Sequence, residues 1–183
     1  MKVGKEIIFF LLLSIAFVAC KQDNVPRIDQ REINQSQILG GWIISSTKTY
    51  INVAPLYQLA VKAAGLEGKL ADQFRNKAAG GAFYFKKDTV YFLRDEIVQD
   101  SSKYTLDAYK IYLENPNLIG FYAPYFYIKF QDGLLTAYLR KDETMLLLQE
   151  DGSLNGYMGL IRSVVSDAEC DLILQRSKIS GFD

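Results

Sequence analysis

The feature that most limits the fold of this chain is a series of short segments in which apolar and polar residues alternate. The segments cover residues 83–85, 90–93, 104–106, 109–113, 125–130 and 135–139. Successive side chains of a β-strand point to opposite faces, so this alternation predicts strands with one buried face. Turn-forming sequences separate them, the clearest being Asn115-Pro116-Asn117 and Asp132-Gly133. The series therefore predicts antiparallel strands that follow one another along the chain.

Further strands and two helices flank this series. Residues 42–51 and 170–174 predict a strand at each end, and residues 144–149, after a turn at Asp142-Glu143, predict one more. Helical spacing predicts a first helix, bent or interrupted at Gly65 and Gly68, from Leu56, Leu59, Ala63, Leu66, Leu70 and Phe74. A second helix, with Asp151 or Ser153 as its N-cap, is predicted from Leu154, Tyr157, Met158, Ile161 and Val165.

About eight short, evenly spaced strands favour a closed up-and-down barrel, because closure leaves no sheet edge exposed. The aromatic content agrees, since 12 Tyr and 11 Phe suit pleated, half-buried strands. We therefore predict a mainly β fold, an antiparallel barrel of about eight strands with a helical insertion after the first strand and a helix before the last. A barrel of this size is wide enough to be filled by side chains or to hold one small ligand.

The first 19 residues have the pattern of a secretory signal peptide. Lys2 and Lys5 precede an apolar run over residues 7–18, and the small Ala19 comes before a polar stretch. The run is shorter than the roughly 20 residues that a membrane-spanning helix needs. Cys20 stands at the break, which resembles bacterial lipoprotein signals, in which cleavage leaves a lipid-modified cysteine as the first residue. The resemblance implies an outer-membrane lipoprotein attached through acyl chains on Cys20, on the periplasmic or the cell-surface face.

These patterns divide the chain into three parts. Residues 1–19 are the predicted signal peptide, residues 20–37 the lipidated cysteine and a polar tether, and residues 38–183 the barrel domain. The tether contains Pro26 and many amide and charged side chains, and we expect a helical turn just before Ile38. The remaining length suits one domain with a sizeable core.

Gly40-Gly41-Trp42 opens the first predicted strand. It resembles the Gly-x-Trp opening of lipocalins, in which the tryptophan closes one end of the barrel. With the lipoprotein start, the helical insertion and the late helix, the chain from Ile38 to Gln175 is similar to lipocalin-like lipoproteins of Bacteroidetes, many of them in families of unknown function. The resemblance implies that Trp42 is a structural plug. The helical insertion departs from the ordinary lipocalin plan, and we expect it to cap the barrel instead of leaving an open mouth.

Composition argues against several classes of function. Without the leader the chain has 19 basic and 20 acidic residues, whereas nucleic-acid binders normally have a basic excess. It has no histidine, which removes the commonest general base and the usual zinc ligand. The adjacent acids Asp95-Glu96, Asp142-Glu143 and Glu150-Asp151 are expected in solvated turns rather than as a catalytic pair. We therefore expect no nucleic-acid partner, enzymatic activity, metal site or cofactor.

The second cysteine, Cys170, alternates in phase with Leu172 and Leu174. This phase predicts a buried, inert thiol. Since Cys20 would be lipidated, Cys170 has no partner for a disulfide within the chain.

The alternation also predicts which side chains face inward. Large apolar residues in the inward positions are candidate ligand-binding residues of the barrel interior: Trp42, Phe83, Phe85, Phe92, Phe126, Phe130 and Leu139. Tyrosines in the intervening positions point outward and are candidates for a partner surface: Tyr84, Tyr91, Tyr112, Tyr125, Tyr127 and Tyr138. Helices packed over the outward face, or cross-strand tyrosine pairs that stabilise it, would explain the same pattern.

Two functions remain open at this level. The first is binding of a small hydrophobic ligand inside the barrel, which requires an internal cavity of at least about 300 Å³. The second is an accessory or scaffold role, in which the outward tyrosines dock on an envelope protein complex or a glycan. The fold alone does not decide between them, because one fold supports many functions.

Overall fold

The computed structural model describes residues 32–150 and 152–182, which lie within one compact unit, Arg31–Asp183. The predicted signal peptide, Cys20 and Pro26 lie outside the described residues, as does Asp151. None of the helices in the described ranges is long and apolar enough to cross a membrane.

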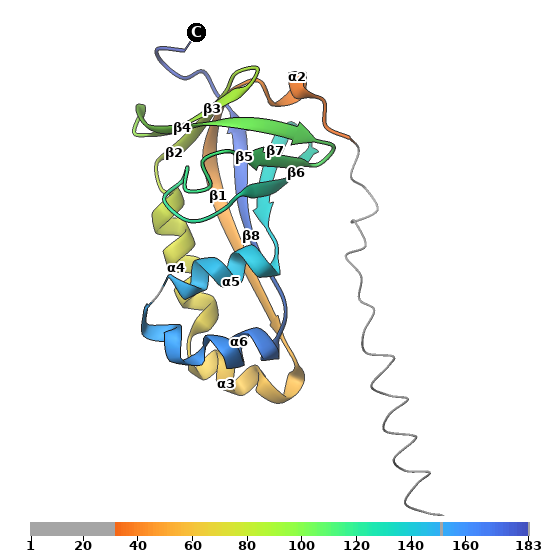
Figure 1. The fold of residues 1–183 in the computed structure, drawn as a ribbon, viewed down its shortest axis with the longest axis vertical. Coiled ribbons are helices and arrows are strands. Elements are labelled where there is room, and N and C mark those ends of the chain that lie inside the picture. The colour runs from red at the N-terminus through yellow and green to blue at the C-terminus, as the bar shows by residue number, and fades with distance from the viewer. Residues whose placement is uncertain (1–31, 151, 183) are drawn as a thin grey trace, which may run out of the picture. The chain divides into compact units, whose positions relative to one another are not determined.

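Eight antiparallel strands form a closed barrel, in which neighbouring strands pair in chain order and the last strand pairs with the first (Figure 1). The strands are β1 (Gly40–Val53), β2 (Gly81–Phe85), β3 (Thr89–Arg94), β4 (Ile97–Asp107), β5 (Lys110–Leu113), β6 (Tyr125–Gln131), β7 (Leu134–Leu139) and β8 (Val165–Arg176). The predicted turn at Asp132-Gly133 is a two-residue hairpin in which both residues have positive φ, 52° and 77°. The predicted fold class is confirmed.

The longest pairing in the barrel joins β1 to β8. It runs from Trp42 opposite Arg176 to Val53 opposite Val165. On its other edge β1 pairs with β2 only over Gly40–Ile43, and β8 pairs with β7 only from Cys170 onward. The second half of β1 and the first half of β8 therefore continue beyond the other strands as a two-stranded ribbon (Figure 1).

Helices surround this ribbon and close the adjoining end of the barrel (Figure 1). The first group, between β1 and β2, is η1 (Pro55–Tyr57), α3 (Gln58–Ala63) and α4 (Leu66–Ala78). The second, between β7 and β8, is α5 (Lys141–Gln149), η2 (Gly152–Tyr157) and α6 (Met158–Val164). Phe74 of α4 meets Phe121 of the β5–β6 connection with ring centroids 5.9 Å apart. These buried side chains belong to the same core as the barrel interior, so the expected helical cap is present.

The predicted strand over residues 144–149 is wrong, because this segment is helix α5. A short, almost continuously apolar run fits a buried strand and a buried helix equally well. Here Glu143 decides between them, since its carboxylate accepts the backbone N–H of Arg140 at 3.2 Å and so satisfies the first turn of a helix. Thr144, Met145, Leu147 and Leu148 are buried against the barrel.

The first predicted helix has the expected interruption but not the expected continuous buried face. Gly65 has a φ of 64°, which ends α3 and redirects the chain into α4. Leu66, Leu70 and Phe74 of α4 are buried, as predicted. Leu56 and Leu59 are each 84 % exposed, because the bend turns η1 and α3 away from the barrel.

The second predicted helix is divided, since η2 is a 3-10 helix and only α6 is α-helical. Gly156 and Gly159 lie near this division, where glycine weakens an α-helix. Leu154, Met158 and Ile161 are buried as predicted, whereas Tyr157 is 64 % exposed and Val165 begins β8.

The other end of the barrel is closed around Trp42, which is fully buried. Its indole Nε1–H donates to the carbonyl oxygen of Ile38 at 2.7 Å, in the predicted helical turn, α2 (Gln35–Ile38). The guanidinium carbon of Arg176, the cross-strand neighbour of Trp42, lies 4.7 Å from the centre of the indole ring. Trp42 is therefore held by a hydrogen bond and a cation–π contact as well as by packing, as expected of a plug.

Gly41 is required by this closure, and its substitution gives a direct test. A Cβ at Gly41 would lie 2.4 Å from the carbonyl oxygen of Ser177 and 2.7 Å from Cγ1 of Ile179. We expect Gly41→Ala to lower the free energy of unfolding by about 1–3 kcal/mol, the usual cost of overpacking. Urea unfolding followed by tryptophan fluorescence measures the change.

Gly68→Ala is the matched control, because a Cβ there has no neighbour within 4 Å and the residue lies in α4. This variant should be unchanged or slightly more stable, by up to about 1 kcal/mol. Equal stability of Gly41→Ala and the parent chain would contradict the tight closure.

Candidate functional site

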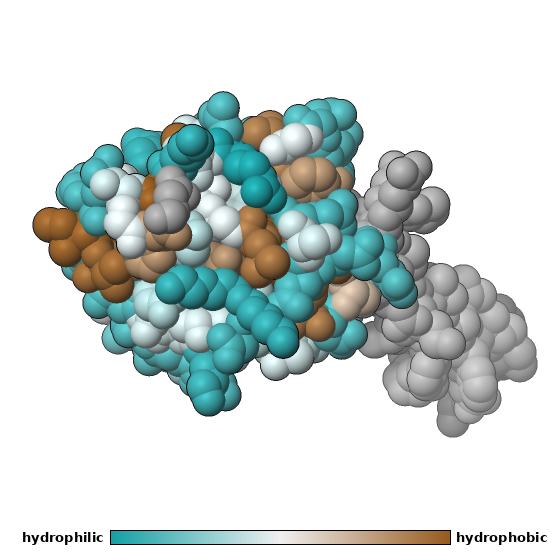
Figure 2. Space-filling model, turned by 90° about the horizontal axis from the view of Figure 1, so that it is seen from above, coloured by the Kyte–Doolittle hydropathy of each residue, from teal (hydrophilic) through white to brown (hydrophobic). Residues whose placement is uncertain are grey.

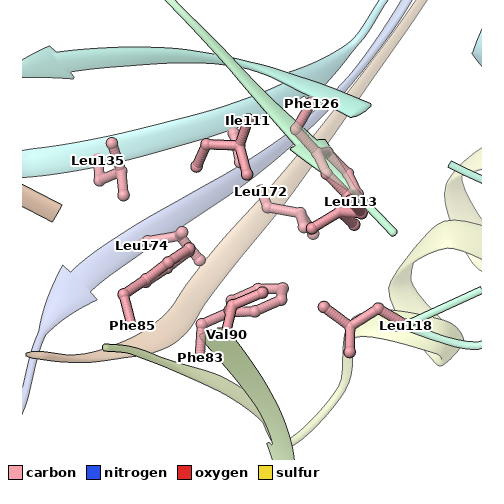
Figure 3. Close-up of a pocket in the computed structure, with 11 residues that line it drawn as sticks. Phe83, Phe85, Val90, Ile111, Leu113, Leu118, Phe126, Leu135, Leu172 and Leu174 are labelled. Atoms are coloured by element: carbon pink, nitrogen blue, oxygen red, sulfur yellow. The ribbon is translucent and has the colours of Figure 1, made fainter. Parts of the chain in front are cut away.

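The barrel interior is filled by its own side chains. Those around its centre point toward one another and come from six strands and the β5–β6 connection (Figure 3): Phe83, Phe85, Val90, Ile111, Leu113, Leu118, Phe126, Leu135, Ala137, Leu172 and Leu174. The volume open to the centre of a water molecule is about 20 Å³. This suffices for about one water and lies far below the volume of a ligand pocket.

The predicted interior residues follow this packing with one exception. Trp42, Phe92 and Leu139 are at most 3 % exposed, and Phe83, Phe85 and Phe126, which line the central space, at most 5 %. Phe130 is 37 % exposed, because it lies at the end of β6 beside the β6–β7 turn, with its ring edge-on to Trp42 at 6.2 Å. The interior side chains fill the space that a ligand would need, so their role in ligand binding stays a prediction.

An apolar groove lies between the two helix groups. It has a volume of about 360 Å³, within the range of small-molecule sites. Its walls come from η1, α3 and α4 on one side and from η2 and α6 on the other: Tyr57, Ala60, Val61, Ala64, Leu66, Lys69, Leu154, Tyr157, Leu160, Ile161 and Val164. We call this space the helical groove.

The helical groove has a buried floor and an exposed rim. Its floor includes Leu66, Leu154, Ile161 and Val164, each at most 7 % exposed. At the rim, Tyr57, Tyr157 and Leu160 are 40 %, 64 % and 59 % exposed. The small Ala60 and Ala64 keep the space open between the helices. An apolar interior with a few polar groups at the edge is the usual character of a site for an apolar small molecule.

The six predicted partner tyrosines fall into two outer-face clusters. Tyr84 and Tyr91 pack on Phe182 near the C-terminus, with ring centroids 4.5 and 5.1 Å from it. The other four form a contiguous aromatic group on β5, β6 and β7, in which one ring pair is tilted, one edge-on and one stacked: Tyr112, Tyr125, Tyr127 and Tyr138. In this group Tyr127 and Tyr138 are only 8 % and 5 % exposed, whereas Tyr112 is 39 % exposed. Stacking therefore covers part of the predicted partner surface.

Cations further cover the second cluster. The Lys110 ammonium nitrogen lies 4.6 Å from the Tyr127 ring centre and 4.8 Å from that of Tyr125. The Arg140 guanidinium carbon lies 4.1 Å from the Tyr127 ring centre. Cation–π contacts of this kind stabilise the outer face without any partner.

Glu143 is a buried carboxylate at the edge of this cluster, not the solvated turn residue that the adjacent acids predicted. It is 7 % exposed and accepts a hydrogen bond from the Tyr125 hydroxyl at 2.5 Å. Burial, and then the hydrogen bond to Glu143, raise the pKa of Tyr125 well above its ordinary value. The pair joins α5 to β6, which is a structural role.

The thiol of Cys170 is fully buried, as predicted from its phase in β8. Burial raises the pKa of Cys170 to about 12, so its thiolate is absent at neutral pH. Within the described residues, no group of three or more acidic or cysteine side chains is placed to hold a metal ion.

The burial of Cys170 predicts slow modification in the folded state. In the chain from Lys21 to Asp183, which has Cys170 as its one thiol, we expect DTNB at pH 8 to react at least about a hundredfold faster in 6 M urea than in buffer. An unfolded thiol ionises near pH 8.5. Because the pKa of Cys170 is higher in the folded state, it stabilises the fold below that pH, and this stabilisation is lost as the pH rises toward 12. Rapid labelling of the folded chain would contradict the burial.

The helical groove was not predicted from sequence. Its two walls are about 90 residues apart in the chain, and each wall was predicted only as a helix facing the core. Leu56 and Leu59, the two leucines of residues 55–63, gave no signal of the groove, because neither of them lines it.

Comparison with known proteins adds no relative. No family model, no curated protein and no solved structure matches the chain significantly. The arguments for function therefore come from this chain's own geometry.

Proposed function

We propose that this chain is an outer-membrane-anchored lipoprotein that binds a small hydrophobic ligand in the helical groove. The groove itself carries the proposal, since its volume is about 360 Å³ against about 20 Å³ inside the barrel. The sequence before Cys20 supports the anchor, because it resembles a lipoprotein signal.

The lining supports an apolar ligand with a polar end. Valine, leucine and isoleucine side chains form the floor, and they offer no hydrogen bonds to a buried polar group. Tyr57, Tyr157 and Lys69 bring polar atoms to the lining. A ligand that buries a hydrocarbon part and keeps its polar end near these groups satisfies both regions.

Affinity should rise with the length of the ligand's hydrocarbon part. Each buried methylene contributes about 0.8 kcal/mol, so two more carbons raise affinity about tenfold until the groove is full. Straight-chain alcohols of increasing length, competing with the fluorescent probe N-phenyl-1-naphthylamine, measure this dependence. Mass spectrometry of small molecules that copurify with the chain from Lys21 to Asp183 identifies the natural occupant.

Two alanines of α3 provide a matched pair of variants. Ala60 lines the helical groove, whereas Ala63, on the same helix, is exposed and does not line it. We expect Ala60→Trp to weaken probe binding at least about tenfold, because the indole fills the groove. Ala63→Trp should bind the probe like the parent chain. Equal binding by both variants, or no binding by the parent, would exclude the groove as the ligand site.

The second candidate is a docking role on an envelope protein through the tyrosine cluster of β5–β7. Tyr112 favours it, since this side chain remains 39 % exposed at the edge of a stacked tyrosine group, and tyrosine is enriched in interfaces.

Crosslinking in intact cells tests this role. We expect Tyr112→Ser to lose at least about half of a specific crosslink while the fold is kept, because exposed tyrosines are common hot spots. Leu134→Ser is the control, since Leu134 is 38 % exposed on β7 and lies outside the tyrosine group. The same crosslinks in both variants and the parent chain would argue against the docking role.

A further inference from the structure

The helices that form the outer part of the helical groove expose several large apolar side chains together. Leu56 and Leu59 are each 84 % exposed, Tyr157 is 64 %, Leu160 is 59 % and Tyr57 is 40 %. They lie on η1, α3, η2 and α6. Tyr57, Tyr157 and Leu160 also line the edge of the groove, whereas Leu56 and Leu59 lie outside it. We call these five residues the leucine rim. Large exposed apolar groups that lie together mark surfaces that contact something other than water.

The charged side chains described on η1, α3, η2 and α6 are basic. Among the described residues of 55–63 and 152–164, Lys62 and Arg162 are the charged ones, and both are basic. Both are exposed, and each lies in the last turn of its helix. This positive charge is complementary to an anionic surface.

We propose that the leucine rim docks on the surface of an anionic lipid bilayer. Exposed leucines beside basic residues are the composition of helices that lie in a membrane interface, where apolar side chains enter the acyl boundary and cations meet head groups. Tyrosine also concentrates at this depth, because its ring is apolar and its hydroxyl is wet. The leucine rim combines all three.

A second copy of the chain fits the same surface less well. A symmetric contact through the leucine rim would bring Lys62 and Arg162 of one copy toward the same residues of the other, and like charges at an interface are unfavourable. The opposite end of the barrel, which carries the C-terminus, is largely hydrophilic, with its apolar patches separated (Figure 2). The helical end is therefore the better bilayer-facing surface.

The proposed tether attaches at the end of the barrel opposite the leucine rim. It enters the domain at Glu32, just before α2, whereas the leucine rim follows the far end of β1 (Figure 1). β1 runs for about 43 Å, and the twelve residue steps from Cys20 to Glu32 span at most about 40 Å when extended. Acylation of Cys20, as proposed above, would therefore add little to docking by the leucine rim. The docking itself requires neither acylation nor a ligand, so it can be tested without either.

Vesicle flotation of the unacylated chain from Lys21 to Asp183 tests the proposal. This chain contains the whole compact unit, Arg31–Asp183. We expect it to float with vesicles of phosphatidylglycerol and phosphatidylethanolamine, and to partition less into phosphatidylcholine vesicles or at high salt. Leu56→Asn with Leu59→Asn should reduce partitioning at least about tenfold, and Lys62→Gln about fivefold.

Ile97→Asn with Val98→Asn is the matched control. Ile97 and Val98 are 66 % and 46 % exposed on β4 and do not belong to the leucine rim, so their loss should not change flotation. The proposal would be overturned if the leucine double variant floated as well as the parent chain. It would also be overturned if the parent chain floated with neither kind of vesicle. Concentration-dependent dimers lost in the leucine variant, without flotation, would also overturn it and indicate a second copy.

The two proposals fail separately because they depend on different residues. Leu56 and Leu59 do not line the helical groove, so their double variant should still bind N-phenyl-1-naphthylamine. Ala60→Trp should lose the probe and still float with anionic vesicles. One of these variants could lose both probe binding and flotation while its thermal unfolding transition stays intact. That result would show that docking and ligand binding share one surface and would reject docking as a separate property.

Discussion

The packing of the barrel interior is the constraint on which the rest of the structure depends. Aromatic and branched side chains from opposite strands meet at the centre and leave room for about one water. Trp42 and α2 close one end, and α4, α5 and the β5–β6 connection close the other. Because the barrel interior has room for only about one water, an apolar small molecule must bind outside it. The helices attached to the β1–β8 ribbon provide the alternative space, the helical groove, and they carry Leu56 and Leu59, the most exposed large apolar side chains among the described residues.

Much of the barrel could be predicted because apolar and polar residues alternate in the sequence wherever a strand has one buried face. This holds for β2, β3, β6, β7 and the second half of β8. It fails over Ile97–Lys103, where β4 is exposed on almost every residue and two apolar residues are followed by polar ones without alternation. It also fails at α5, where an apolar run without clear period was assigned to a strand and the buried carboxylate of Glu143 was taken for a turn residue.

The candidate site was harder to predict than the fold, because it depends on how distant segments meet. Leu56 and Leu59 fit a helical stripe, and only the bend at Gly65 shows that this stripe leaves the core. Alternation predicts whether a side chain points into the barrel or away from it. It does not predict how far other side chains cover that residue from solvent. Tyr127 and Tyr138 point outward and are buried by stacking on each other, and Phe130 is half exposed because its strand ends there.

The pairing of β1 with β8 also determines when the chain can fold. Synthesis begins at the N-terminus, so β1 is made early and its partner strand follows more than 100 residues later. Until β8 emerges, β1 and β7 present open edges, which are prone to pair with other chains. Closure of such a distant contact is slow. The barrel is therefore completed only when β8 is available, and the ribbon that supports the helical groove is the last part to form.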